Sequence, residues 1–370
     1  MLFLYENVFD FPENVFDLTS FFCDICLMRE TTLKEIASAL GISITTVSKA
    51  LKNYPDVSDK TKKAVIALAK ELDYTPNSFA VNLRTKESKT IGLIIPEVVH
   101  HFFSGVVNGI IAEAEKNGYL VIILQSNESL ELEKKQVALL INKRVDGILM
   151  SLSNESNDDV HIKDILKKEI PFVQFDKISK LIPSSKVIIN DQKAAMDAVQ
   201  HLIDMGCKRI AHIRGLENPQ NAIDRFLGYK KALEKNGISF DPALVYSCQS
   251  ITFEQGVEFA KQILEEEDKG IDGIFVITDL VAVGVLAHFN EKGIQVPNQF
   301  AVIGFSNWFV SQVITPKLST VDQPNYEMGV EAFNLLLEEI VCRKEVRVFE
   351  PKTIELKTKV VVRESTMKNK

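Results

Sequence analysis

The stretch that most constrains the fold is residues 32–51, TLKEIASALGISITTVSKAL. Thr32 and Glu35 have the spacing of a capping box, in which each side chain satisfies a free backbone N–H of the other residue. Apolar residues follow at the spacing of one helix face, at Leu33, Ile36, Ala37 and Leu40. Gly41 can end this helix in the left-handed conformation, and Ser43 can cap a second helix.

Two short helices joined by a turn that contains glycine are typical of the helix-turn-helix motif. The outer face of the second helix is small, hydroxylated and basic at Thr45, Ser48 and Lys49. Such a face can enter the major groove of DNA, where the first residues of a recognition helix meet base edges. The alternative is an ordinary helical hairpin, and features elsewhere in the sequence are needed to distinguish the two.

The net charge of −7 looks unsuited to a nucleic-acid-binding protein until it is divided along the chain. Residues 1–27 hold five acidic residues and no Lys or Arg, whereas residues 28–89 hold 11 Lys or Arg against seven Asp or Glu. The remainder holds 32 basic residues against 38 acidic ones. Positive charge is therefore concentrated around the two helices, where phosphate contacts would be needed.

The first 27 residues repeat ENVFD at 6–10 and 13–17 but lack the basic start and apolar core of a signal peptide. We expect 1–27 to be a disordered tail or a misassigned translation start, because Met28 stands directly before the first predicted helix. Farther along, Ser58 can cap a third helix, and three helices in about 45 residues make only a small core. The run SFAVNLR at 78–84 is compatible with a helix but too short to be stable alone.

From Thr90 onward, apolar runs of strand length alternate with amphipathic stretches, which is typical of parallel βαβ units. The predicted strands are 91–98, 119–125, 145–152, 171–176, 209–215, 244–248, 273–279 and 300–305. They suggest two doubly wound halves of similar size. Ligands of such folds lie beyond the carboxyl ends of the strands, here in a cleft between the halves.

The order of these parts resembles the lactose-repressor/purine-repressor family of bacterial transcription regulators, over about nine-tenths of the chain. The matching motifs are IA at 36–37, VSKAL at 47–51, VS at 57–58, LDYTPN at 72–77, AxxL at 80–83, IG at 91–92, VDG at 145–147, GCKRI at 206–210, RxxGY at 225–229, VIGF at 302–305 and LSTVDQP at 318–324. The resemblance implies an N-terminal all-α helix-turn-helix headpiece and an α/β two-lobed effector domain like the type I periplasmic binding proteins. We expect the headpiece at 28–76, a hinge helix and linker at 77–89, the two-lobed ligand-binding and dimerisation domain at 90–366 and a tail at 367–370. Within the two-lobed domain, we expect the first lobe at about 90–190 and 323–351 and the second lobe at about 191–322 and 352–366.

The resemblance also implies a homodimer, or a tetramer, that binds a near-palindromic double-stranded DNA operator. Ile44 and Thr45 would then face bases and Lys49 a base or a phosphate; the apolar Ile44 could read only a thymine methyl group or DNA shape. Leu83 matches the hinge leucine that wedges into a minor-groove step, although it could instead pack against its dimer mate. The remaining candidate contacts are Thr32, Ser43, Thr46, Ser48, Asn53, Ser58, Tyr74, Asn77, Ala80 and Arg84.

Because the hinge helix is weak, its folding is expected to be coupled to DNA binding, so that a ligand in the cleft can control operator affinity. Phe102 and Phe103 follow the first strand and could stack on a flat ligand or simply pack in the core. Arg225 matches a ligand-contacting arginine of the family, with a surface ion pair near Asp224 as its alternative. Asp279 could accept hydrogen bonds from ligand hydroxyls or cap the next helix.

The segment 304–308, GFSNW, is the main departure from the family. Many members have a ligand-binding aspartate where Ser306 stands, so only uncharged hydrogen bonds from Ser306 and Asn307 remain. Trp308, the single tryptophan, could be a stacking platform, and Gln125 is a further candidate. Aromatic rings with neutral partners favour a carbohydrate as effector and leave a purine-like ligand open.

Other classes of protein have little support in the sequence. We find no phosphate-binding G-x-x-x-x-G-K-[ST] loop, no G-x-G-x-x-G and no metal-ligand cluster, so we expect neither an enzyme nor a cofactor or metal. Cys23 and Cys26 form a lone C-x-x-C without a second pair, and no apolar run is long enough for a membrane span. A two-lobed solute receptor without DNA function is the runner-up. The expected location is the bacterial cytoplasm, in association with the nucleoid.

Overall fold

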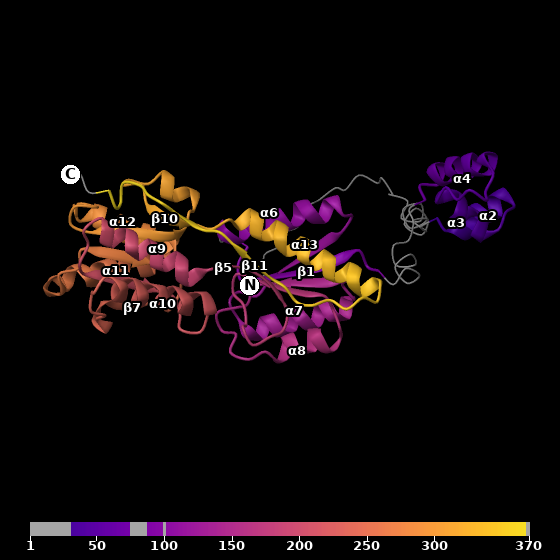
Figure 1. The fold of residues 1–370 in the computed structure, drawn as a ribbon. Coiled ribbons are helices and arrows are strands. Elements are labelled where there is room, and N and C mark those ends of the chain that lie inside the picture. Colours follow the sequence, from indigo (N-terminus) through magenta and orange to yellow (C-terminus); the bar gives the residue numbers. More distant parts are fainter. Residues whose placement is uncertain (1–30, 75–86, 99–100, 368–370) are drawn as a thin grey trace, which may run out of the picture. The chain divides into compact units, whose positions relative to one another are not determined.

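The computed structural model describes residues 31–74, 87–98 and 101–367 (Figure 1). The chain divides into two compact units, Met1–Thr85 and Lys86–Lys370. Four candidate DNA contacts in the hinge, Asn77, Ala80, Leu83 and Arg84, lie outside the described residues, as does the expected N-terminal tail. We describe each unit by itself.

We call the first unit the headpiece, and its described residues form three helices, α2 (Leu33–Leu40), α3 (Ile44–Leu51) and α4 (Asp59–Glu71). The predicted capping box is confirmed, since the Thr32 backbone N–H donates to the Glu35 carboxylate at 2.7 Å and the Glu35 N–H donates to Thr32 Oγ1 at 3.4 Å. Gly41 follows α2 with φ of 64°. The small apolar core consists of Ile36, Ala37, Val47, Ala50, Val57, Val65 and Ala69.

The second unit holds two six-stranded sheets, one in each lobe. The first sheet is parallel throughout and has the order β11-β5-β4-β3-β1-β2. Its strands are β1 (Thr90–Ile95), β2 (Leu120–Gln125), β3 (Gly147–Met150), β4 (Phe172–Phe175), β5 (Ser185–Ile189) and β11 (Thr353–Leu356). The helices of this lobe are α6 (His101–Lys116), α7 (Leu130–Lys143), α8 (Val160–Lys167) and α13 (Asn325–Lys344).

The second sheet has the order β12-β10-β9-β8-β6-β7, and only β12 runs antiparallel to its neighbour. Its strands are β6 (Ile210–Arg214), β7 (Val245–Ser247), β8 (Gly273–Val276), β9 (Ala301–Ser306), β10 (Ser319–Asp322) and β12 (Lys359–Val361). Its helices are α9 (Asp191–Asp204), α10 (Gln220–Lys235), α11 (Phe253–Glu265) and α12 (Asp279–Glu291). Each of the eight predicted runs contains a strand, whereas β5, β10, β11 and β12 were not predicted.

The chain crosses between the lobes three times, after β5, after β10 and after β11 (Figure 1). The first two crossings agree with the expected boundaries near 190 and 322. The expected boundary at 351/352 is wrong, because β11 pairs with β5 in the first sheet through Thr353–Lys186 to Leu356–Ile189. The sequence of β11, TIEL, alternates polar and apolar residues over only four positions, which is too short to have revealed this pairing.

Close helix packing requires glycine where α6 crosses α13 in the first lobe. A Cβ atom at Gly109 would lie 2.3 Å from the Tyr326 carbonyl oxygen, and one at Gly329 would lie 2.0 Å from the Val106 carbonyl oxygen. Any larger residue would push the two helices apart, because neither contact is with a movable side chain. This tight pair covers one side of the first sheet, and α7 and α8 cover the other (Figure 1).

Candidate functional site

The start of α3 presents the surface that the sequence predicted would face DNA. Ile44 is 47% exposed, and Thr45 is also exposed. Ser48 is half-buried, and the Lys49 side chain is 42% exposed. The Lys49 ammonium forms an ion pair with the carboxylate of Asp56, in the turn that follows α3. This exposed set leaves the first turn of α3 accessible to a base edge or a phosphate.

Several other predicted DNA contacts have structural tasks within the headpiece. Thr32, Ser43 and Ser58 are the N-cap residues of α2, α3 and α4, and the side chain of each accepts a hydrogen bond from the backbone N–H of the third residue of its helix. Thr46 bonds to the Ser43 hydroxyl at 2.8 Å. Tyr74 packs against the headpiece core, and burial raises the pKa of its phenol. Asn53 is exposed in the left-handed conformation, with φ of 57°. DNA contacts by these residues stay predictions.

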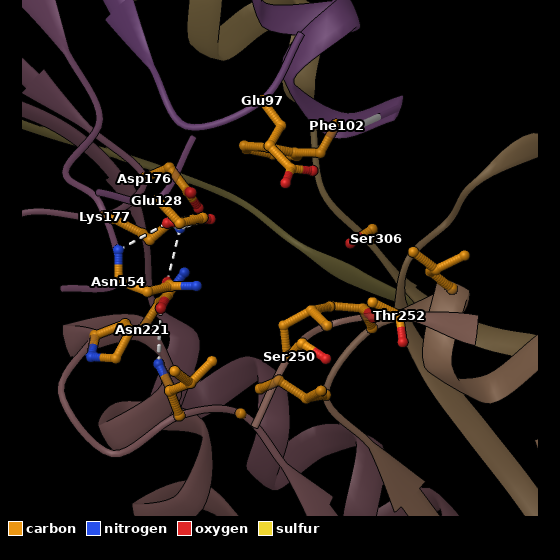
Figure 2. Close-up of a pocket in the computed structure, with 18 of the residues that line it drawn as sticks. Glu97, Phe102, Glu128, Asn154, Asp176, Lys177, Asn221, Ser250, Thr252 and Ser306 are labelled. Atoms are coloured by element: carbon orange, nitrogen blue, oxygen red, sulfur yellow. Dashed lines mark hydrogen bonds and ion pairs between the residues drawn. The ribbon is translucent and has the colours of Figure 1, made fainter. Parts of the chain in front are cut away.

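In the second unit, the ends of strands from both sheets enclose a cleft of about 620 Å³ (Figure 2). The first lobe contributes residues that follow β1 to β4, and the second lobe contributes residues that follow β6 to β9. Such a cleft at the carboxyl ends of parallel strands is the expected ligand position in a doubly wound fold. Its volume lies within the range of small-molecule sites.

The predicted aromatic residues divide between this cleft and a smaller cavity beside it. Phe102 and Phe103 both line the cleft, with their rings edge to face at 5.3 Å, and they are only 4% and 5% exposed. Trp308 instead lines the cavity of about 190 Å³, together with His101 and Phe102. Trp308 therefore does not line the main cleft, and its predicted role as a stacking platform stays a prediction for the smaller cavity.

Arg225 lies in the wall of the cleft and is 4% exposed. Its Nε donates to the Asp191 carboxylate at 2.7 Å, its Nη1 donates to the Ile277 carbonyl at 2.9 Å, and its guanidinium stacks 3.7 Å from the Phe305 ring centroid. Burial raises the pKa of Asp191 to about 6, and the Arg225 charge opposes this rise. The alternative of a surface ion pair near Asp224 is wrong, since Asp224 pairs with Lys180.

Asp279 does not cap the next helix and does not line the main cleft, and its contact with ligand hydroxyls stays a prediction. Thr278, not Asp279, caps α12, and the buried Asp279 carboxylate accepts from Thr320 Oγ1 at 2.6 Å and from the Trp308 N–H at 2.7 Å. Burial raises its pKa to about 6. Asp279 thus ties the loop after β9 to β10, and it borders only the smaller cavity.

The three remaining candidates also separate. Ser306 lines the cleft and donates to Gln323 Oε1 at 3.0 Å. Asn307 does not line the cleft, because its amide is held by Asp322 at 2.8 Å and by Arg363 at 2.7 Å. Gln125 does not line it either, since its Oε1 accepts from the Val98 N–H at 2.9 Å.

The sequence interpretation missed most of the polar wall of the cleft. These residues follow strand ends, and their position there was the signal that could have found them. They are Glu97, Asn127, Glu128, Asn154, Glu155, Asp176, Lys177, Asn221, Gln249, Ser250, Thr252, Glu254 and Gln323. In Figure 2, Glu97 and Phe102 lie across the cleft from Asn221 and Ser250.

The described parts of the chain contain neither a membrane-spanning helix nor a cluster of metal ligands. None of their helices is long and apolar enough to span a membrane. Within the same residues, no three His, Cys, Asp or Glu side chains gather closely enough to hold a metal ion.

The helix-turn-helix headpiece and the two-lobed domain with a ligand-sized cleft together define the class of DNA-binding regulators that respond to small molecules. Two family models match the chain, the lacI family of bacterial regulatory proteins at residues 32–77 and the periplasmic binding protein-like domain at residues 199–366. Catabolite control protein A of Priestia megaterium is 33% identical over 306 residues, which is 82% of this chain and 91% of that protein. The transcriptional repressor CytR of Escherichia coli K12 is 34% identical over 309 residues, 84% of this chain and 89% of CytR.

Solved structures agree with this class. The transcriptional regulator CelR in complex with cellobiose is 27% identical, with a TM-score of 0.69 over 91% of this chain and 100% of that one. The lac repressor dimer bound to operator and the anti-inducer ONPF has a TM-score of 0.81 over 92% of this chain and 100% of that one, and at 24% identity it shows the fold alone. The chain belongs to the LacI family of bacterial transcription regulators. It is a DNA-binding repressor of that family and not an enzyme.

Proposed function

We propose that a small molecule, a sugar or sugar derivative, binds in the cleft and controls the operator affinity of this repressor. The observation that carries the proposal is the cleft itself, whose walls come from both lobes. A ligand that contacts both walls favours one angle between the lobes, and the three crossing segments allow that angle to change. The CelR structure contains cellobiose, and a LacI-family regulator from Enterococcus faecium, 26% identical, contains ribose.

We further propose that two copies of the chain, or four, bind a near-palindromic double-stranded operator through Ile44, Thr45 and Lys49. Exposed apolar side chains on the second unit support pairing of two copies. Among them are Leu120 and Ile123 on the edge strand β2, 64% and 36% exposed, and Phe309 and Val313 after β9, 59% and 69% exposed. A repressor of this kind acts at the chromosome, which places it in the cytoplasm with the nucleoid.

The main test is binding of the full-length protein to DNA from upstream of its own gene and to a scrambled duplex of equal length. We expect preferential binding of the upstream DNA, with an affinity that falls steeply between 50 and 200 mM salt. Equal affinity for both duplexes would favour a solute-binding protein without DNA function. Light scattering of the free protein measures its molar mass and so tests whether two copies of the chain associate.

The same assay, repeated with single sugars and nucleobases, tests control by an effector. A ligand that lowers operator affinity acts as an inducer, and one that raises it acts as a co-repressor of the purine type. The buried Phe102–Phe103 pair, which could stack on a base, keeps this second possibility open. If no ligand that binds the protein changes operator affinity, the proposed control is wrong.

A further inference from the structure

The cleft contains more negative charge than its own cations neutralise. Five carboxylates and two cations line it, namely Glu97, Glu128, Glu155, Asp176 and Glu254 against Lys177 and Arg225. A sugar site with balanced charges would need no compensation from its ligand. This one has an excess of carboxylates.

Both cations are already engaged. The Lys177 ammonium donates to the two Glu128 oxygens at 2.6 and 2.9 Å and to Asn154 Oδ1 at 2.8 Å, as the dashed lines in Figure 2 show. Arg225 is paired with Asp191, which stands behind the wall of the cleft. Within the described residues, Glu97, Asp176 and Glu254 therefore form no ion pair.

Asp176 is half-buried, whereas Glu97, Glu155 and Glu254 are exposed. Asp176 follows β4 directly and has φ of 57°, which turns the chain into the cleft. Removal from water raises the pKa of Asp176, even though the Lys177 and Arg225 charges oppose the rise. Its negative charge is thus incompletely stabilised by the protein.

An independent observation comes from the opposite side of the cleft. Gln323 lines the cleft and is only 5% exposed, and its Oε1 accepts the Ser306 hydroxyl. Its Nε2 has no hydrogen-bond partner among the residues that the structure describes. A buried donor without a partner destabilises the protein, and an oxygen of a bound ligand could accept from it.

We propose that the ligand carries a protonated amine, held by Asp176 and Glu97, and a neutral oxygen that accepts from the Gln323 amide. An amino sugar is the simplest molecule of this chemistry. A neutral sugar would displace water from these carboxylates without compensating their charge, and a sugar phosphate would be repelled by them. This inference deepens the proposed function, since it rests on effector binding in the same cleft.

The experiment uses full-length protein without DNA and calorimetry with matched ligand sets. One set is glucosamine, glucose and glucose 6-phosphate, and the second is the corresponding galactose series. We expect the amine of at least one set to bind at least tenfold more tightly than its neutral counterpart, and both phosphates to bind more weakly still. The preference should decrease with increasing salt.

Asp176→Asn is the diagnostic variant, because asparagine tolerates the left-handed conformation of this position. We expect it to reduce the preference for the amine to less than threefold. The control is Glu115→Gln, which removes the same charge from an exposed position on α6 and should keep the full preference. Circular dichroism checks that both variants are folded.

The inference is overturned if a neutral or phosphorylated member binds as well as the amine, or if no amine of either set binds. It is also overturned if Asp176→Asn keeps the full preference. These outcomes differ from failure of the proposed function. A neutral sugar that binds and changes operator affinity would leave the proposed function intact, and an amine that binds without changing operator affinity would contradict the proposed function alone.

Discussion

The side chains that would contact DNA on the headpiece and those that line the cleft differ in exposure and in how firmly other residues hold them. On α3, the side chains of Ile44 and Thr45 are exposed, and Lys49 has only a surface ion pair with Asp56. In the cleft, Arg225 and Lys177 are buried and held by two or more partners each. DNA recognition therefore starts from side chains that are accessible and weakly held. Recognition in the cleft starts from a wall that is already ordered.

This difference follows from the sizes of the two cores. The headpiece has seven buried apolar residues, too few to hold charged groups below its surface. The second unit has three clusters of buried apolar residues, and its burial shifts the pKa values of Asp191, Asp279 and His212 strongly. Substitutions in the two units should therefore have separable effects.

The largest effect is expected from Ile36→Ala in the headpiece. Ile36 is fully buried, and loss of such a side chain costs about 2–5 kcal/mol, which a core of this size cannot absorb. We expect operator affinity to fall more than a hundredfold while thermal unfolding of the second unit stays the same. The matched control is Ile66→Ala on α4, where the side chain is 54% exposed. A common loss of stability in both units would contradict their independence.

The next effect is a dependence of stability on pH that should reside in the second unit alone. Burial lowers the pKa of His212 to about 3, and its ring stacks on Phe275 at 4.7 Å. The histidine of the unfolded chain is protonated below about pH 6.5, whereas His212 of the folded chain stays neutral down to about pH 3. The contribution of neutral His212 to the free energy of unfolding is therefore complete above pH 6.5. It is lost as the pH falls toward 3, at about 1.4 kcal/mol per pH unit.

Urea unfolding at pH 7 and pH 5 measures this effect. We expect the wild-type protein to lose about 2 kcal/mol more between these values than His212→Gln does. The headpiece has no histidine between residues 31 and 74, so its unfolding should not show this dependence. Equal losses in wild type and variant would show that His212 does not govern the change.

A smaller effect is expected from Lys49→Ala. Loss of one contact to a base or phosphate should weaken operator binding by about tenfold and reduce the slope of affinity against salt by about one unit. Fluorescence anisotropy at 50, 100 and 200 mM salt measures both quantities. Lys70→Ala, at an exposed position near the end of α4, is the control. An unchanged slope would reject the predicted orientation of α3.

The smallest effect is expected from Asp56→Asn, which releases Lys49 from its ion pair. Exposed ion pairs of this kind contribute little, so affinity for DNA should rise by no more than about fivefold. Glu71→Gln removes the same charge from another exposed position of the headpiece and serves as the control. If both variants raise affinity equally, the gain comes from net charge and not from release of Lys49.

The sequence by itself determined the headpiece almost completely. The capping box at Thr32 and Glu35, the left-handed Gly41 and the cap at Ser43 are local features, and each depends on residues within a few positions of one another. The eight apolar strands of the second unit could be predicted for a similar reason, since a buried parallel strand is an uninterrupted apolar run. The same strand pattern predicted a cleft between the two halves.

The tertiary structure alone decided which side chains reach the cleft. Asp279, Asn307 and Trp308 follow the right strands but are held by Thr320, Asp322 and Arg363 or directed to a smaller cavity. The pairing of β11 with β5 joins residues more than 160 positions apart, and no local pattern encodes it. Charge balance in the cleft is likewise a sum over segments that follow six different strands. Such sums depend on where the whole chain brings its side chains together, and for that reason they could not be inferred from any one stretch.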